Sequence, residues 1–109
     1  MIASKAGVVD AYFAAIRARD ADALAALFAP DAELVTAAGT FRGREAIAGF
    51  YRDLAFGVED LWPDPGPVVA DGDRIAVEIQ LRMNGATSAV ADFFTFAGAF
   101  ITRLVIYAG

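Results

Sequence analysis

Residues 8–35 read VVDAYFAAIRARDADALAALFAPDAELV, and this stretch places two helix signals and a strand signal in close succession. In its first half, apolar side chains return at the spacing of one helical face, while the charged residues fall elsewhere. The pattern predicts a first helix from Ser4 to Arg17. Its apolar positions are Val8, Val9, Tyr12, Phe13 and Ile16.

A second, short helix is expected immediately afterwards. Asp20 is a suitable N-cap, because its carboxylate can accept a hydrogen bond from a free backbone N–H of the first turn. Asp22 complements the positive end of the helix dipole. Pro30 ends this helix, whose apolar stripe consists of Leu24, Leu27 and Phe28.

A strand and a third helix follow. Residues 32–36 have the character of a strand, and Gly39 turns the chain after it. A third helix is predicted to open near Arg44. Its apolar face consists of Ile47, Phe50, Tyr51 and Leu54.

The second half of the chain is predicted to be a meander of about four strands. Residues 62–67, WPDPGP, are expected to form a loop, because three prolines and a glycine interrupt any regular element. The strands are residues 68–70, 74–83, 87–96 and 101–107, which are rich in β-branched and aromatic side chains. Asn84-Gly85 between two such runs is a strong hairpin signal. Helices from the first half are the available cover for this sheet.

The composition limits the size and class of the protein. With 109 residues, we expect a single domain over residues 1–109. Hydrophobic residues make up 58% of the chain, more than a small monomer readily hides. Part of the apolar surface is therefore expected to meet a ligand or a second subunit.

Several classes of function are disfavoured. The chain has no cysteine and no histidine, which excludes thiol and imidazole chemistry, and no acidic cluster predicts a metal site. No cofactor is expected. A net charge of -5 argues against nucleic acid as a partner. No stretch approaches the roughly 20 apolar residues of a membrane helix, and the N-terminus has no leader pattern. We therefore expect a cytoplasmic protein without a membrane partner.

Four segments together resemble one protein family. Residues 8–35, residues 41–54 (FRGREAIAGFYRDL), residues 90–96 (VADFFTF) and residues 101–107 (ITRLVIY) are similar to the ketosteroid isomerase and SnoaL-like branch of the NTF2-like superfamily. The resemblance implies an α+β, NTF2-like cone, in which three N-terminal helices pack on a curved, mixed but mostly antiparallel sheet. The mouth of such a cone is a common place for a small apolar ligand.

The resemblance also implies roles for individual residues. In that family, a tyrosine and a protonated aspartic acid donate hydrogen bonds to a dienolate oxygen, while a second aspartate moves the proton. The tyrosine corresponds to Tyr12, the donor acid to Asp92 and a supporting tyrosine to Tyr51. The position of the proton-moving aspartate is occupied by Thr36, which cannot act as a base near neutral pH. Glu33 is the nearest acid, but an unbroken strand would turn it to the opposite face.

Asp92 admits two interpretations. Burial among apolar neighbours would raise its pKa and leave it neutral, able to donate a hydrogen bond. Alternatively, Arg103 on the last strand could pair with it and keep it ionised. Simple alternation puts Arg103 in phase with Ile101, Val105 and Tyr107, on the pocket-facing side of that strand. The residues expected to bind substrate are Tyr51, Phe50, Trp62, Phe94, Arg103, Val105 and Tyr107.

The opposite face of the sheet is predicted to form a homodimer interface. Strand alternation places Glu78, Gln80 and Arg82 there, beside Phe93, Leu104 and Ile106. So much apolar side chain on an outer face, with a polar rim, is typical of a subunit contact.

Three functional hypotheses follow. The first is an isomerase-like enzyme that transfers a proton on a hydrophobic carbonyl compound, such as a steroid- or polyketide-like enone, with Tyr12 and Asp92 polarising the carbonyl. The second is a non-catalytic ligand-binding or dimerisation domain, which the threonine at position 36 favours. The third is a protein-interaction scaffold.

Overall fold

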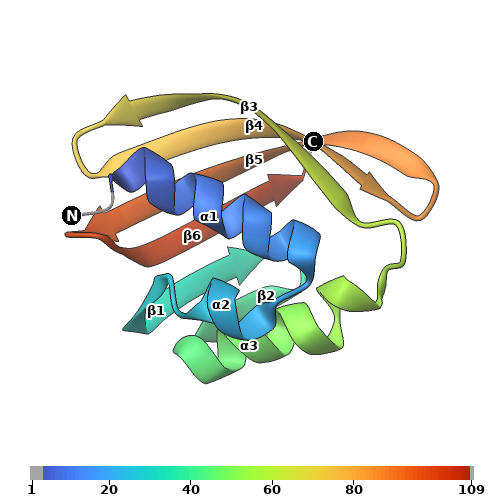
Figure 1. The fold of residues 1–109 in the computed structure, drawn as a ribbon, viewed down its shortest axis with the longest axis horizontal. Helices are drawn as coiled ribbons and strands as arrows, with labels where there is room; N and C mark the ends of the chain where they lie inside the picture. The colour runs from blue at the N-terminus through green and yellow to red at the C-terminus, as the bar shows by residue number, and fades with distance from the viewer. Residues whose placement is uncertain (1–3, 109) are drawn as a thin grey trace.

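The computed structural model describes residues 4–108, in which helices cover one face of a strongly curved sheet (Figure 1). The helices are α1 (Lys5–Ala18), α2 (Ala21–Ala25) and α3 (Arg44–Asp53), followed by the 3-10 turn η1 (Ala55–Gly57). The strands are β1 (Phe28–Thr36), β2 (Gly39–Arg42), β3 (Trp62–Asp71), β4 (Arg74–Met83), β5 (Ala86–Ala97) and β6 (Phe100–Ala108).

The ends of the first two helices follow from local hydrogen bonds. The Ser4 hydroxyl accepts from the backbone N–H of Gly7 and caps α1. The helix ends at Arg19, which adopts a left-handed conformation with φ of 56°. The predicted cap of α2 is confirmed, because the Asp20 carboxylate accepts from the backbone N–H of Ala23. The first helix therefore turns sharply into the second.

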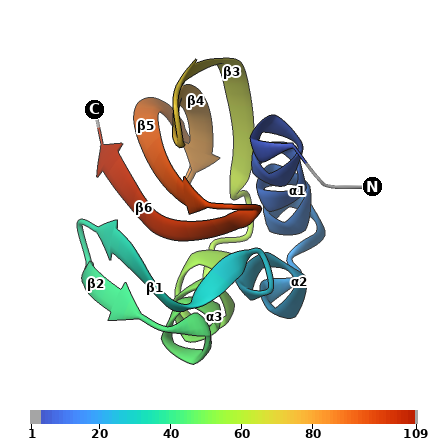
Figure 2. The same cartoon turned by 90° about the vertical axis from the view of Figure 1, so that its left-hand side faces the viewer.

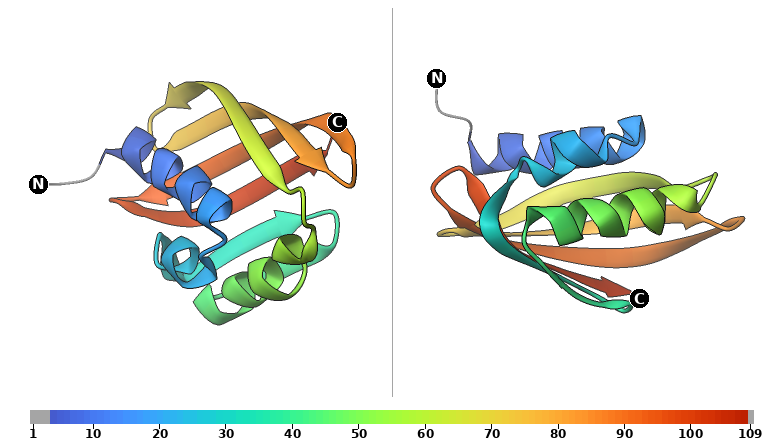
Figure 3. Two further views of the ribbon diagram at one scale, coloured as in Figure 1. Left: turned by 45° about the vertical axis from the view of Figure 1, so that its right-hand side comes forward. Right: turned by 90° about the horizontal axis from the view of Figure 1, so that it is seen from below.

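The sheet has the strand order β2-β1-β6-β5-β4-β3. Strands β3 to β6 form the predicted antiparallel meander, and β1 joins it by pairing in parallel with β6. The sheet curls around the helices, which all lie on its concave side (Figures 2 and 3). The fold is α+β with a mixed, mostly antiparallel curved sheet, as predicted.

Strand β3 corrects one expectation. Residues 62–67 are not a loop, because β3 begins at Trp62 and pairs with β4 through Pro63 and Pro65. Proline cannot donate to a strand ladder, but β3 is the last strand of the sheet and needs partners on one side only. The register shifts between Pro65 and Val68, where the strand accommodates the irregular segment.

Helix α2 is shorter than predicted: it ends at Ala25 and does not include Leu27 or Phe28. Pro30 does not end the helix but lies within β1, which begins at Phe28, and a short strand β2 follows the Gly39 turn.

A bulge in β6 determines which of its side chains face the helices. Arg103 pairs with Thr95, but Phe96 pairs with Ile101, so Thr102 is an extra residue on β6. An extra residue reverses the alternation of the strand. Past the bulge, Leu104 and Ile106 point inward, whereas the strand pattern without a bulge predicted the opposite.

Candidate functional site

A cavity of about 400 Å³ lies between α1, α3, the segment after α3 and the concave face of the sheet. Its lining is apolar except for Thr36, Ser88, Asp92 and two tyrosines. The tyrosines are Tyr12 from α1 and Tyr51 from α3. The apolar lining residues are Phe13, Ile16, Ala37, Ala38, Phe50, Leu54, Ala55, Val58, Leu61, Pro63, Ile79, Leu81, Met83, Val90, Ile106 and Ala108.

The hydroxyl groups of Tyr12 and Tyr51 are hydrogen-bonded to each other. The Tyr12 ring is held in place by edge-to-face contacts with Phe13 and Phe94, whose ring centroids lie 5.0 and 5.3 Å away. Burial raises the pKa of both phenols well above the ordinary value of 10, so both are neutral donors at physiological pH. One proton serves the bond within the pair, and the other remains available for a further acceptor.

Asp92 is the buried acid of the cavity. It lies on β5 between Val77 of β4 and Ile106 of β6, and its residue surface is 3% exposed. No group within residues 4–108 donates a hydrogen bond to its carboxyl oxygens or forms an ion pair with them. Burial raises its pKa to about 7, because water no longer stabilises the charged form. The carboxyl group can therefore gain or lose a proton near neutral pH.

Thr36 lines the same cavity, but its hydroxyl is already engaged. It accepts from the backbone N–H of Ala38 at 3.0 Å and donates to the carbonyl oxygen of Gly39 at 3.3 Å. This bonding closes the turn between β1 and β2. Glu33 faces the opposite side of β1, as the strand alternation predicted, and pairs there with Arg42 and Arg103. Neither residue offers a base to the cavity.

Of the two interpretations of Asp92, the pairing with Arg103 is not found. The Arg103 Nε atom lies 3.1 Å from Oε1 of Glu33, on the outer face of the sheet. Val105 and Tyr107 share that outer face, so the prediction that these three residues face the pocket is wrong. The physical reason is the bulge at Thr102, which reverses the alternation after Ile101.

The remaining predicted ligand contacts divide into two groups. Phe50 and Tyr51 line the cavity as expected. Phe94 lies behind Tyr12 in the core and is not part of the lining. Trp62 is also not among the lining residues: it is half-exposed at the sheet edge, where the guanidinium of Arg17 lies 5.3 Å from its ring centroid.

Two parts of the cavity were not found from the sequence. The segment after α3 supplies Ala55 and Val58, and no periodic pattern marks it as a wall. The inward positions Ile106 and Ala108 depend on the bulge in β6, which has no glycine or proline to signal it. Only the pairing of β6 with its neighbours shows where these side chains point.

The fold and the cavity together define a cone-shaped α+β domain with a buried acid and a tyrosine pair facing an apolar interior. The family model of the SnoaL-like domain matches residues 9–104, and the chain belongs to this family. Comparison with curated proteins found no match. Within residues 4–108, no helix has the length and apolar character needed to cross a membrane.

Solved structures share the fold over most of the chain. A candidate polyketide cyclase from Sinorhizobium meliloti is 28% identical, with a TM-score of 0.84 over 91% of this chain and 92% of that one. A protein with a ketosteroid isomerase-like fold from Catenulispora acidiphila, in complex with trimethylamine, is also 28% identical, with a TM-score of 0.83 over 92% of this chain and 83% of that one. An NTF2-like protein from Cytophaga hutchinsonii has a TM-score of 0.86 at 15% identity, over 100% of this chain and 93% of that one.

Proposed function

We propose that this protein is an isomerase- or cyclase-like enzyme that transfers a proton on a hydrophobic carbonyl compound of the enone or polyketide type. The observation that carries the proposal is Asp92, a carboxyl group 3% exposed and without a hydrogen-bond partner among residues 4–108, which faces an apolar cavity of about 400 Å³. A general acid or base works best when its pKa lies near the working pH, and burial raises the pKa of Asp92 to about 7.

The tyrosine pair is the proposed electrophile. The proton of the pair that is not used between Tyr12 and Tyr51 can be donated to the carbonyl oxygen of a ligand. Charge develops on that oxygen when a neighbouring C–H loses its proton, and a fixed donor in a dry cavity stabilises this charge. Asp92 in its carboxylate form would remove the proton and, once neutral, return it at another carbon or donate a hydrogen bond to the enolate oxygen.

This division of roles differs from the one expected from the family resemblance. There, Asp92 was expected to act with Tyr12 in polarising the carbonyl, and the family's base position was found to be occupied by Thr36, which cannot act as a base. The Thr36 hydroxyl is engaged by Ala38 and Gly39, and Asp92 is the carboxyl group that the described cavity lining offers for proton transfer. The relative from Sinorhizobium meliloti, a candidate polyketide cyclase, supports carbonyl chemistry as the class of reaction.

The experiment is an isomerisation assay with a simple β,γ-enone, followed by the ultraviolet absorbance of the conjugated product. We expect the wild-type rate to rise with pH through about 7 as Asp92 ionises. Asp92→Asn should lower the rate by about 100- to 10,000-fold, the usual contribution of a positioned general base. The matched control is Arg42→Gln, on the outer face of the sheet, which should not change the rate. An Asp92→Asn variant with the wild-type rate would refute the proposal.

A second candidate function is non-catalytic binding of an apolar small molecule. The specific observation is that the cavity offers a single carboxyl group and no second base among its described lining residues. The relative from Catenulispora acidiphila is in complex with trimethylamine, a small amine. If wild-type protein binds apolar ligands, measured as a rise in melting temperature, but neither exchanges nor isomerises enone protons at any pH, binding is the function.

A further inference from the structure

The segment from Leu54 to Leu61, here called the strap, closes one side of the cavity. Its lining residues are Leu54, Ala55, Val58 and Leu61. The strap contains one element of regular secondary structure, the 3-10 turn η1. The backbone N–H groups of Gly57, Val58 and Leu61 donate hydrogen bonds to carbonyl oxygens within the strap. Such short local bonds hold a segment weakly. Contacts from outside the strap must therefore fix its position against the cavity.

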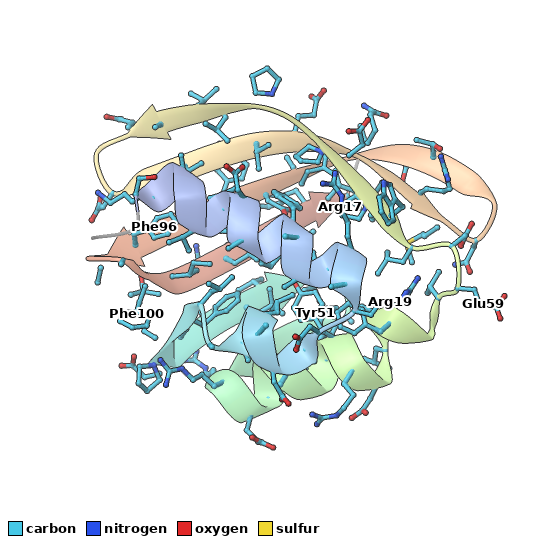
Figure 4. All side chains as sticks on the ribbon, in the orientation of Figure 1. Arg17, Arg19, Tyr51, Glu59, Phe96 and Phe100 are labelled. Atoms are coloured by element: carbon cyan, nitrogen blue, oxygen red, sulfur yellow. The ribbon has the colours of Figure 1, made fainter. Side chains whose placement is uncertain are left out.

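Arg19 provides one set of these contacts. Its guanidinium donates to the carbonyl oxygens of Phe56 at 2.9 Å, Val58 at 3.0 Å and Glu59 at 2.8 Å. Figure 4 shows the Arg19 side chain extending from the end of α1 toward the part of the chain that carries Glu59. The left-handed backbone of Arg19, with φ of 56°, ends α1 at the point from which the side chain reaches the strap.

Asp60 provides the second set, next to Glu59, whose carbonyl oxygen Arg19 binds. Its carboxylate accepts from the backbone N–H of Asn84 at 2.7 Å and of Gly85 at 2.8 Å. These two residues form the turn between β4 and β5, next to the cavity-lining residue Met83. The strap thus bridges the end of α1 and the tip of a hairpin, two parts of the fold that are far apart in the sequence.

We propose that Arg19 and Asp60 are positioning residues of the cavity: together they hold the strap as its side wall, and ligands enter and leave by local release of the strap. The role of the wall in ligand retention rests on the proposed function, because it requires the cavity to bind an apolar molecule. The anchoring itself does not depend on any ligand. Neither residue lines the cavity, so each acts through the strap.

The chemistry of the two anchors is specific. A guanidinium presents five N–H donors in a planar fork and can serve several carbonyl oxygens at once, whereas the ammonium group of lysine is a compact point charge. Arg19→Lys keeps the charge but should not span the carbonyls of Phe56, Val58 and Glu59. In Asp60→Asn, the side chain keeps its shape but loses the charge that strengthens its bonds to two N–H groups.

The test combines amide hydrogen exchange with binding of Nile red, a neutral apolar dye, by wild type, Arg19→Lys, Arg19→Gln and Asp60→Asn. Arg42→Gln is the matched control, because Arg42 pairs with Glu33 on the outer face. We expect the amides of Gly57, Val58 and Leu61 to exchange at least tenfold faster in the strap variants, with core strand amides unchanged. The dye should dissociate at least fivefold faster from the same variants, including Arg19→Lys.

The outcomes separate the two proposals. Unchanged exchange in the strap, or an equal acceleration throughout the core, would overturn the anchoring. Faster strap exchange with an unchanged dissociation rate would overturn the role of the strap in ligand retention. Faster strap exchange in a protein whose wild type binds no dye and transforms no enone would support the anchoring and contradict the proposed function instead. If the Arg19 variants fail to fold, amide exchange and dye dissociation in Asp60→Asn test the proposal independently.

Discussion

The hydroxyl of Tyr12 on α1 is hydrogen-bonded to the hydroxyl of Tyr51 on α3, thirty-nine positions further along the chain. Both rings are almost fully buried, and the bond ties the two helices together where both tyrosines line the cavity. A pair of phenols shares one proton internally and keeps the second for another acceptor. The same bond is therefore part of the fold and part of the proposed site.

Removing either hydroxyl group should lower the stability of the fold. In Tyr12→Phe or Tyr51→Phe, the remaining hydroxyl loses its partner in a buried position, which costs on the order of 1–3 kcal/mol of unfolding free energy. The double variant should cost less than the sum of the two, because it leaves no unpaired hydroxyl. Urea denaturation of wild type, the two single variants and the double variant measures the coupling energy between the two hydroxyl groups. Strictly additive losses would show that the two hydroxyls do not depend on each other.

Asp92 should make stability depend on pH. Its pKa is 3.8 in an unfolded chain and about 7 in the folded protein. Between these values the folded state binds a proton that the unfolded state has lost, so the contribution of Asp92 to stability is most favourable at low pH and declines as pH rises toward 7. The slope is about 1.4 kcal/mol per pH unit over this interval.

The measurement is the unfolding free energy from pH 4 to pH 8 for wild type and Asp92→Asn. The difference in unfolding free energy between wild type and Asp92→Asn should change across this range and become constant above about pH 7. Asp31→Asn, an exposed position on β1, is the control and should leave the wild-type pH profile in place. A wild-type profile that matches that of Asp92→Asn throughout would mean that folding does not raise the pKa of Asp92.

A carboxylate at position 36 should increase proton transfer. Thr36 lines the cavity at the end of β1, where the related isomerases are expected to carry an aspartate. Aspartate can replace the threonine in the turn, because its carboxylate can also accept from the N–H of Ala38. We expect Thr36→Asp to raise the enone isomerisation rate by about 100-fold or more and to extend activity below pH 7.

The control for this variant is Thr36→Asn, which has the shape of aspartate without the basic carboxylate. It should not raise the rate. If Thr36→Asp and Thr36→Asn behave alike, a carboxylate at position 36 does not reach the reacting carbon.

The outer face of the sheet is the proposed homodimer contact. Phe93 is 45% exposed and Tyr107 is 57% exposed, and their ring centroids lie 5.6 Å apart on this face. Both signs of charge lie on the same face, at Glu33 and Arg103, so a second copy related by a two-fold axis could match them. We expect wild type to be a dimer by sedimentation equilibrium and Phe93→Glu to be a monomer. A monomeric wild type at micromolar concentration would contradict this.

Local sequence signals were sufficient for the starts of the helices in the first half of the chain, but not for the end of α2, which stops at Ala25 rather than at Pro30. The Ser4–Arg17 pattern, the Asp20 cap and the opening of α3 at Arg44 are all present as predicted, because capping and helical periodicity depend on neighbours within a few residues. The same is true of the Asn84-Gly85 turn. The inward direction of Asp92 also follows from simple alternation along β5.

The tertiary structure alone decided what surrounds Asp92. The bulge at Thr102 turns Arg103 away from the cavity, and this bulge is visible only in the pairing of β6 with β5. Likewise, β3 tolerates its prolines because it lies at the sheet edge, a position that no local pattern specifies. Helix and strand signals are local, whereas register, edge position and the partners of a buried charge depend on residues that meet only when the whole sheet has formed.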